Sequence, residues 1–134
     1  MAEAFARALG GDVIVPASAG LAPAMAIARD TIAAMAEKDI GLRDHYPKSV
    51  QNLARVQFDV VVNMAQRPLP ALVREGRQPR LLEWEVPDPI GMTYKEHCQV
   101  RDEIERKVVD LIEELRRQPP PRQFRGQGSG RVPL

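Results

Sequence analysis

Residues 58–64 read FDVVVNM, and this stretch decides the fold. It is almost continuously apolar and rich in β-branched valine, which is typical of a strand buried on both faces of a parallel sheet. Two other runs have a similar character, because residues 13–15 read VIV and residues 80–86 read RLLEWEV. Each is followed at once by a proline, Pro16 or Pro87, which ends a strand. The sequence therefore predicts three strands.

Helices are predicted around these strands. Good helix formers fill residues 1–9, and Gly10-Gly11 ends that helix. Pro23 suits the first turn of an alanine-rich helix over residues 23–37. Shorter helices are expected at residues 49–55 and 70–74. The apolar face of the alanine-rich helix is predicted to consist of Ala28, Ile32, Met35 and Ala36.

The strongest helix signal comes near the end of the chain. Thr93 and Glu96 form a T-x-x-E capping box at the start of a helix that runs to about Arg117. Strands that alternate with helices predict an α/β fold, with a parallel sheet and flanking helices. From Gln118 the composition becomes rich in Pro, Gly and Arg and contains no acid. We therefore expect one domain over residues 1–117 and a disordered tail over 118–134. The predicted apolar stripe of the last helix is Val100, Ile104, Val108, Leu111, Ile112 and Leu115.

Composition narrows the classes of function. The chain has 134 residues and a formal net charge of +1, which gives no argument for a nucleic-acid partner. No apolar run approaches the roughly 20 residues needed to span a bilayer, so no membrane partner is expected. The single cysteine, Cys98, excludes a disulfide framework and a cysteine zinc cluster, and suits a reducing cytoplasm. His45 and His97 have no ligand pattern around them and are predicted to be surface histidines, so we expect neither a metal nor a cofactor.

Three stretches resemble the low-molecular-weight phosphotyrosine phosphatase superfamily, which also contains arsenate reductases and bacterial protein-arginine phosphatases. The opening MAEAFARAL resembles the helix after the phosphate loop of these enzymes, where C-x5-R and a Ser precede Met-Ala-Glu. Ser18-Ala19-Gly20 resembles the end of their second strand. Residues 86–89, VPDP, followed by RDEIERKV, resemble their Asp-Pro loop and last helix. The resemblance covers about residues 1–117.

The resemblance implies a mechanism. In this superfamily a cysteine thiolate attacks the phosphorus of a phosphate ester, and an aspartate first protonates the leaving oxygen and then activates water. Carried over to this chain, the general acid and base is Asp88, Pro89 holds its loop, and Ser18 supports the phosphate loop by hydrogen bonding. The implied substrate is a phosphoprotein or another phosphate ester, with phosphotyrosine and phosphoarginine both open. The alternative for Asp88 is an ordinary turn carboxylate between two prolines.

The chain also departs from the superfamily pattern. The cysteine and arginine of C-x5-R are not in the sequence, so we interpret the chain as truncated before Met1, without the first strand and the phosphate loop. Cys98 is interpreted as partly buried packing in the last helix, and no nucleophile is assigned. The extra cysteines of arsenate reductases are absent, and one of them would fall near residues 63–66, NMAQ. Residues 90–92 read IGM where eukaryotic members carry paired tyrosines, which favours a bacterial member.

These departures leave more than one function open. The first interpretation is a phosphatase-like domain that is inactive without the missing loop. The alternative is a truncated, non-catalytic module for binding or dimerisation, and arsenate reduction is less favoured. In the superfamily the first strand lies between the second and the third, so its loss would expose the edges of residues 13–15 and 58–62. We expect the gap to close by movement of these strands or by a homodimer.

Overall fold

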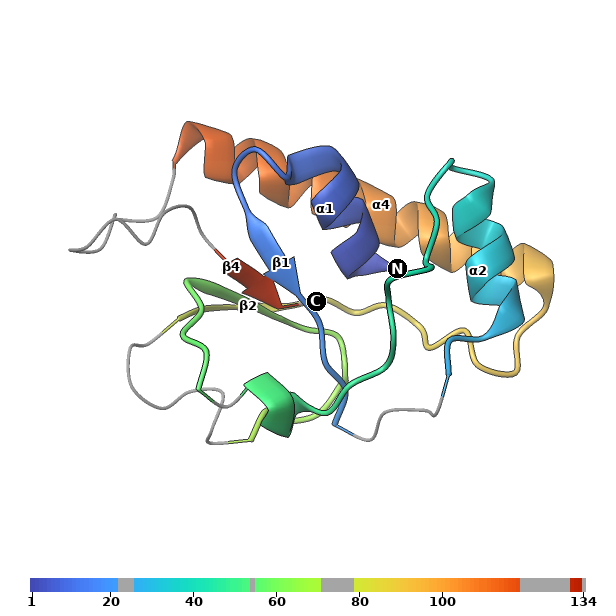
Figure 1. Cartoon of the computed structure of the whole chain (residues 1–134), viewed down its shortest axis with the longest axis horizontal. Helices are drawn as coiled ribbons and strands as arrows, with labels where there is room; N and C mark the ends of the chain where they lie inside the picture. Colours follow the sequence, from blue (N-terminus) through green and yellow to red (C-terminus); the bar gives the residue numbers. More distant parts are fainter. Residues whose placement is uncertain (22–25, 54, 71–78, 119–130, 134) are drawn as a thin grey trace.

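The computed structural model describes the chain except for residues 22–25, 54, 71–78, 119–130 and 134. It has the α/β architecture predicted from the sequence, with parallel strands and helices packed against them (Figure 1). The helices are α1 (Ala2–Gly10), α2 (Arg29–Ala36), the 3-10 helix η1 (Val50–Leu53) and α4 (Tyr94–Arg117). The strands are β1 (Val15–Ala17), β2 (Val60–Asn63), β3 (Arg80–Glu83) and β4 (Arg131–Pro133).

The valine run forms the buried strand β2, as the sequence predicts. All four residues of β2 are buried, and β2 pairs in parallel with β3 in the register Val60↔Arg80 to Asn63↔Glu83. Both strands are shorter than predicted, since β2 begins at Val60 rather than at residue 58 and β3 ends at Glu83 rather than at 86. Burial on both faces explains why this strand has no alternation of polar and apolar residues.

The first strand begins two residues later than the VIV run predicts. The backbone N–H groups of Val13 and Ile14 both donate to the carbonyl of Gly10 at 2.9 Å, so these residues close the turn after α1. Ile14 nevertheless lies in the core, with 3% of its surface exposed. The strand itself, Val15–Ala17, contains Pro16, which has no N–H to donate to a neighbour.

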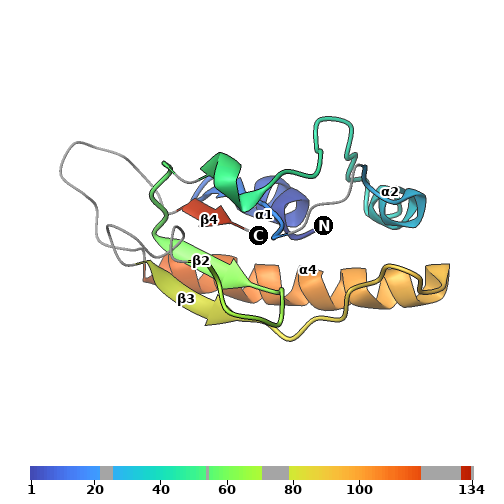
Figure 2. The same cartoon turned by 90° about the horizontal axis from the view of Figure 1, so that it is seen from below.

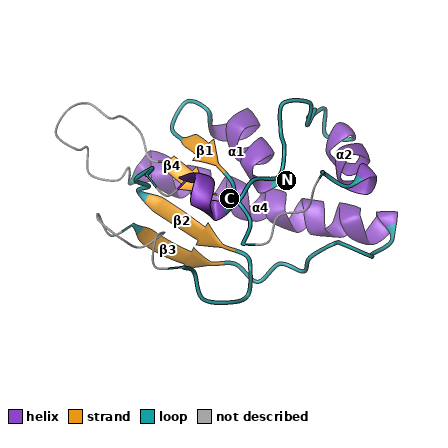
Figure 3. Cartoon of the chain, turned by 60° about the horizontal axis from the view of Figure 1, so that its bottom comes forward, coloured by secondary structure: helices purple, strands orange, loops and turns teal. Residues whose placement is uncertain are grey.

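The fourth strand comes from the segment that the sequence predicts to be disordered. Residues Arg131–Pro133 form β4, which pairs in parallel with β1 and also lies against β2 (Figure 3). These three residues of the predicted tail therefore form a strand, because their backbone pairs with β1, whereas residues 119–130 and 134 lie outside the described residues. The gap expected between β1 and β2 is occupied by the chain itself, and the two strands have not moved together. The predicted homodimer stays a prediction.

Helices α1 and α4 lie against each other behind the strands (Figure 3). Phe5 of α1 and Val108 of α4 are essentially fully buried, and they anchor the core between the helices and the sheet. The capping box at Thr93 is present, because its hydroxyl accepts from the Glu96 N–H and the Glu96 carboxylate accepts from the Thr93 N–H. All six residues of the predicted α4 stripe are buried, which confirms that prediction.

Helix α2 differs from its prediction in extent and in face. It begins at Arg29, and Pro23 lies outside the described residues. Its buried residues are Ala34 and Met35, whereas Ile32 is 45% exposed, so the predicted apolar face is only partly right. Alanine contributes little to a hydrophobic period, and the pattern therefore defined this face weakly. Figure 2 shows α2 beside one end of α4, with which it is in contact.

Two other predictions fall on short segments. The predicted helix at residues 49–55 is the 3-10 turn η1, and the Ser49 hydroxyl accepts from the Gln51 N–H at 3.3 Å. The helix predicted at 70–74 lies almost entirely outside the described residues. In the part of the chain that the structure describes, no helix is both long and apolar enough to cross a membrane.

Candidate functional site

The labelled strands of the sheet all point toward the same end of the molecule (Figure 3). The segments that leave β1, β2 and β3 therefore begin at one edge, close to the amino-terminal end of α1 (Figure 1). This is the edge where open parallel sheets bind their ligands. The predicted site residues Ser18 and Asp88 follow β1 and β3 respectively.

Asp88 lies in a tight turn between β3 and α4. Its Oδ1 accepts from the backbone N–H of Ile90 at 3.0 Å, and the carbonyl of Pro89 accepts from the Met92 N–H at 2.9 Å. The turn leads directly to the cap of α4 at Thr93, which anchors one end of it. The Asp88 side chain is exposed, so a ligand in solvent reaches it freely. This geometry allows both readings of Asp88, as a proton donor and as a turn carboxylate.

The turn after β2 is shaped by Asn63. This residue is 5% exposed; its Oδ1 accepts from the Ala65 N–H at 2.9 Å, and its Nδ2 donates to the Arg67 carbonyl at 2.8 Å. Gln66, in a left-handed backbone conformation with φ of 61°, donates from Nε2 to the Val86 carbonyl at 3.5 Å. Val86 lies two residues before Asp88, so Gln66 connects this turn with the Asp88 loop. Residues 63–66 supply amides here and no thiol.

Ser18 is half-buried and lines a cavity of about 140 Å³. Glu3 and His45 line the same cavity. Within the described residues, no hydrogen bond connects Ser18 with Asp88. The structure thus places these two residues in different loops at one edge of the sheet.

A cluster around Glu3 was missed by the sequence analysis. The Glu3 side chain is 9% exposed, and its carboxylate lies 2.7 Å from His45 Nδ1 and 3.7 Å from Lys48 Nζ. Arg7, one helical turn later, approaches it to 4.0 Å. The expectation of a surface His45 is therefore wrong, since His45 is half-buried against this carboxylate. We call these four residues the Glu3 cluster; it fixes the segment before η1 against α1, beside Ser18.

No local signal points to the Glu3 cluster. Glu3 stands in the first turn of an alanine-rich helix, where an acid is favoured by the helix dipole alone. Its partner His45 is distant in the sequence, and a lone histidine has no pattern of its own. The cluster also borders a polar cavity of about 620 Å³, to which Arg43 and Asp44 contribute.

His97 and Cys98 occupy the first turns of α4. His97 is only 3% exposed, and its Nδ1 lies 3.0 Å from the Thr93 carbonyl, so the prediction of a surface histidine is wrong here too. Its ring reaches back along the helix and packs inward with the α4 stripe. Cys98 is half-buried, as expected, but its Sγ contacts a carboxylate, Glu37 Oε2, at 3.4 Å. The thiol therefore faces α2.

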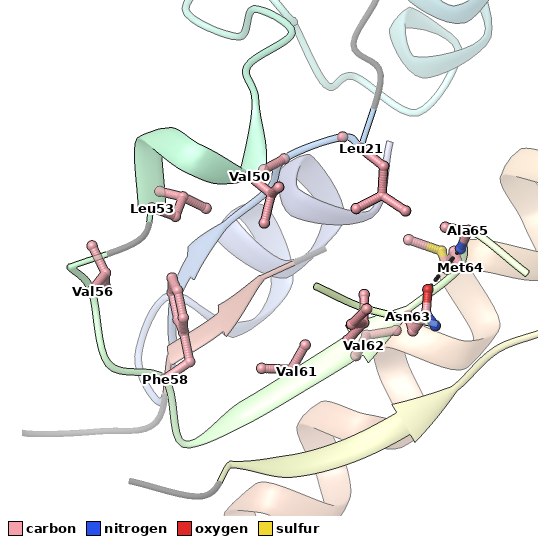
Figure 4. Close-up of a pocket in the computed structure, with 13 residues that line it drawn as sticks. Leu21, Val50, Leu53, Val56, Phe58, Val61, Val62, Asn63, Met64 and Ala65 are labelled. Carbon is pink, nitrogen blue, oxygen red and sulfur yellow. Dashed lines mark hydrogen bonds between the residues drawn. The ribbon is translucent and has the colours of Figure 1, made fainter. Parts of the chain in front are cut away.

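An apolar cavity of about 300 Å³ lies on the face of the sheet that carries η1 (Figure 4). Val61 and Val62 of β2 form one wall, Ala19 to Leu21 after β1 form another, and Val50 and Leu53 of η1 close it from above. We call this space the η1 cavity. The sequence analysis did not predict it, because its walls come from three separate segments.

A metal site has no support among the described residues, where no three His, Cys, Asp or Glu side chains come close enough to hold an ion.

One protein family and two relatives named as arsenate reductases are similar to this chain. The family model described as low molecular weight phosphotyrosine protein phosphatase matches residues 1–121. A putative arsenate reductase from Halobacterium salinarum is 26% identical over 96 residues, which cover 72% of this chain and 66% of that protein. A glutaredoxin arsenate reductase from Synechocystis is 26% identical over 115 residues, 86% of this chain and 87% of that protein. The chain thus spans just under two thirds of the first relative.

Solved structures agree with the sequence relatives. An arsenate reductase in the phosphate binding state matches with a TM-score of 0.74 and 27% identity, over 84% of this chain and 86% of that one. An arsenate reductase in the reduced state matches with a TM-score of 0.72 and 26% identity, over 85% and 86% of the two chains.

Proposed function

Since this chain belongs to the low-molecular-weight phosphotyrosine protein phosphatase family, we propose that it is built for thiol-dependent chemistry on tetrahedral oxyanions. The observation that carries the proposal is Asp88, an exposed carboxylate on a short anchored loop at the carboxyl edge of the sheet. The substrate we favour is a phosphorylated protein side chain, either the ester phosphotyrosine or the phosphoramidate phosphoarginine, in the cytoplasm, where thiols stay reduced.

In the proposed reaction a thiolate attacks phosphorus, and the bond from phosphorus to the leaving atom breaks. This atom is the phenolic oxygen of phosphotyrosine or the guanidine nitrogen of phosphoarginine. Asp88 gives its proton to that atom, and the phosphate remains on sulfur. Water then attacks phosphorus and gives a proton to Asp88, and both phosphate and the thiolate are released. The Glu3 cluster holds the segment before η1 against α1, Ser18 lines a cavity beside it, and Gln66 connects the Asp88 loop with the turn after β2.

The nucleophile of this reaction is not Cys98. It is the single cysteine of the 134 residues, and its Sγ lies against Glu37 at the contact between α2 and α4. A neighbouring carboxylate also repels an incoming phosphate. We therefore propose that the 134-residue chain alone does not hydrolyse p-nitrophenyl phosphate above background.

Turnover of p-nitrophenyl phosphate by the 134-residue chain tests this directly, with Cys98→Ser and Asp88→Asn as matched variants. We expect the background rate from all three proteins. A rate that survives Cys98→Ser but is lost in Asp88→Asn would reveal a different nucleophile. The intact mass of the endogenous protein is the companion measurement. A form with a C-x5-R segment before Met1 is expected to be active, and Asp88→Asn should lower its kcat by roughly 10²–10⁴-fold.

Arsenate reduction is a second candidate, favoured by the names of the sequence relatives and of the structural neighbours. Reduction of arsenate to arsenite takes two electrons, which two thiols supply as they become a disulfide. This chain has one cysteine, so at least one thiol would come from a small thiol such as glutathione. Arsenite production from arsenate with excess glutathione tests this candidate: a rate above the protein-free control supports reduction, and a rate equal to it counts against reduction by this chain.

A further inference from the structure

The polar cavity of about 620 Å³ beside the Glu3 cluster has no part in the proposed reaction. Helix α1 supplies Glu3 and Arg7 to its lining, and the segment between α2 and η1 supplies residues 43–45 and Lys48 (Figure 1). Asp88 does not line it. Its volume is within the range of about 300–1,000 Å³ that is usual for small-molecule sites.

Cations outnumber carboxylates among the described residues that line this cavity. Arg7, Arg43 and Lys48 are charged at neutral pH, and Glu3 and Asp44 oppose them. The Glu3 carboxylate already has three partners within 4.0 Å, none of which is Arg43. Arg43 is exposed and makes no hydrogen bond or ion pair with the part of the chain that the structure describes. The cavity is therefore bordered by a guanidinium whose charge and N–H donors are unused.

Two of the cations are held in place without a ligand. The Lys48 side chain is 18% exposed, and its Nζ lies 3.7 Å from Glu3 Oε1 and 4.9 Å from the centroid of the Tyr46 ring. Arg7 Nη2 donates to the Pro16 carbonyl at 3.2 Å and lies 4.0 Å from the same Glu3 oxygen. Donors that are already ordered lose less conformational entropy when a ligand binds. Glu3 thus positions two cations for an anionic group.

The size and the charges of the cavity narrow the class of ligand. Guanidinium groups bind phosphate oxygens through paired hydrogen bonds, and an ammonium adds a point charge. Free phosphate would occupy only a small part of about 620 Å³, so the remaining space suits an organic group. Asp44 borders the same space, is exposed, and makes no hydrogen bond or ion pair with other described residues. Its carboxylate accepts hydrogen bonds and therefore suits a ligand with hydroxyl groups.

We propose that the polar cavity binds a hydroxylated phosphate monoester, such as a sugar phosphate. The phosphate binds to Arg7, Arg43 and Lys48, and the hydroxyl groups donate to Asp44. The carboxylate of Asp44 also disfavours a second anionic group on the ligand, because like charges repel. Binding requires neither a thiol nor Asp88, so this inference does not rest on the proposed reaction.

Isothermal titration of the full chain with glucose 6-phosphate, inorganic phosphate and glucose tests the proposal. We expect glucose 6-phosphate to bind at least about 10-fold more tightly than inorganic phosphate, and glucose not to bind measurably. Amide chemical shifts in NMR spectra should change at Arg7 and residues 41–48 when glucose 6-phosphate is bound. Equal affinities for the two phosphates, no binding of glucose 6-phosphate, or shift changes confined to the Asp88 loop would overturn the proposal.

Two variants test the groups that hold the ligand. Arg43→Gln removes a side chain without contacts in the described part of the chain, so the fold should persist while glucose 6-phosphate binds about 10-fold more weakly. Arg106→Gln is the matched control, because Arg106 is also exposed and unpaired among the described residues but lies on α4. Asp44→Ala should abolish the preference for glucose 6-phosphate over inorganic phosphate. Equal affinities of Arg43→Gln and Arg106→Gln, or an unchanged preference in Asp44→Ala, would contradict the assigned contacts.

Discussion

The carboxylate of Glu3 is surrounded by cationic or ionisable groups from two parts of the chain, with His45, Lys48 and Arg7 within 4.0 Å. A buried acid of this kind stabilises a fold only while its partners are present, because each charge has lost water. Glu3 is also the last residue of the Met-Ala-Glu motif that resembles the family pattern. This motif residue therefore has a packing role as well. Glu3 therefore contributes to the stability of the fold close to the edge of the sheet at which the proposed site lies.

Glu3→Gln is expected to reduce the free energy of unfolding by about 1–3 kcal/mol, since His45 and Lys48 lose their charged acceptor. Urea denaturation measures the change. Glu113→Gln, on the exposed face of α4, is the matched control and should change stability by less than about 0.5 kcal/mol. Equal effects of the two substitutions would mean that the cluster contributes nothing specific.

Acidic residues between α2 and α4 make stability depend on pH. The hydrogen bond from Tyr94 holds the pKa of Glu37 below its usual value of 4.5, and the hydrogen bond from Arg101 holds the pKa of Asp102 below 3.8. A depressed pKa in the folded state stabilises the fold above the unfolded pKa, and this stabilisation is lost as pH falls through the folded value. Stability should therefore decline as pH falls below about 4.5.

Thermal melts between pH 2 and 7 test this acid dependence. The double variant Glu37→Gln, Asp102→Asn should have a lower melting temperature at pH 7 and a shallower decline in acid than the natural chain. Asp110→Asn, on an exposed position of α4, should leave the decline unchanged. If the melting temperature of the double variant fell in acid as steeply as that of the natural chain, the prediction would be contradicted.

At the scale of elements, α1 and α4 pack closely through a glycine. A Cβ on Gly10 would lie 2.8 Å from Cγ1 and Cδ1 of Ile112, a residue of the buried α4 stripe. Real Cβ contacts are longer than this, so the two helices would have to separate or Ile112 would have to leave its rotamer.

Gly10→Ala should therefore destabilise the chain by about 1–3 kcal/mol, despite the better helix propensity of alanine. Gly41→Ala is a matched control, because a Cβ there meets nothing within 4 Å. Urea denaturation of both variants gives the comparison. If Gly10→Ala were as stable as Gly41→Ala, the α1–α4 contact would be looser than the structure indicates.

Elements with strong local signals were predictable, and those that depend on distant partners were not. The capping box and six-residue stripe defined α4, and the valine run defined β2 as a buried strand. Strand β4 was missed because Arg-Val-Pro has no strand signal and becomes a strand only beside β1. The inward positions of Glu3 and His97 were also missed, since a single polar residue carries no period. Asp88 was assigned by resemblance, and its role remains a proposal.

At the scale of the whole molecule, β4 covers edges that would otherwise attract other chains. Removing residues 119–134 would leave β1 and β2 without β4 between them. We expect the chain that ends at Gln118 to melt at a lower temperature and to associate as its concentration rises, because uncovered strand edges pair readily. Light scattering during size-exclusion chromatography checks this. A shortened chain that stays monomeric and melts like the natural one would show that β4 contributes little.

Strand β4 also has a consequence for synthesis. The pair that joins residue 15 to residue 131 is among the most distant contacts the chain could form. During translation β1, β2 and β3 leave the ribosome before β4, so the sheet stays incomplete until residues 131–133 have been synthesised. Contacts of such sequence separation form slowly, and apolar edges remain open meanwhile. Yield in the cell should therefore depend on chaperones that bind nascent chains, even where the finished protein is stable.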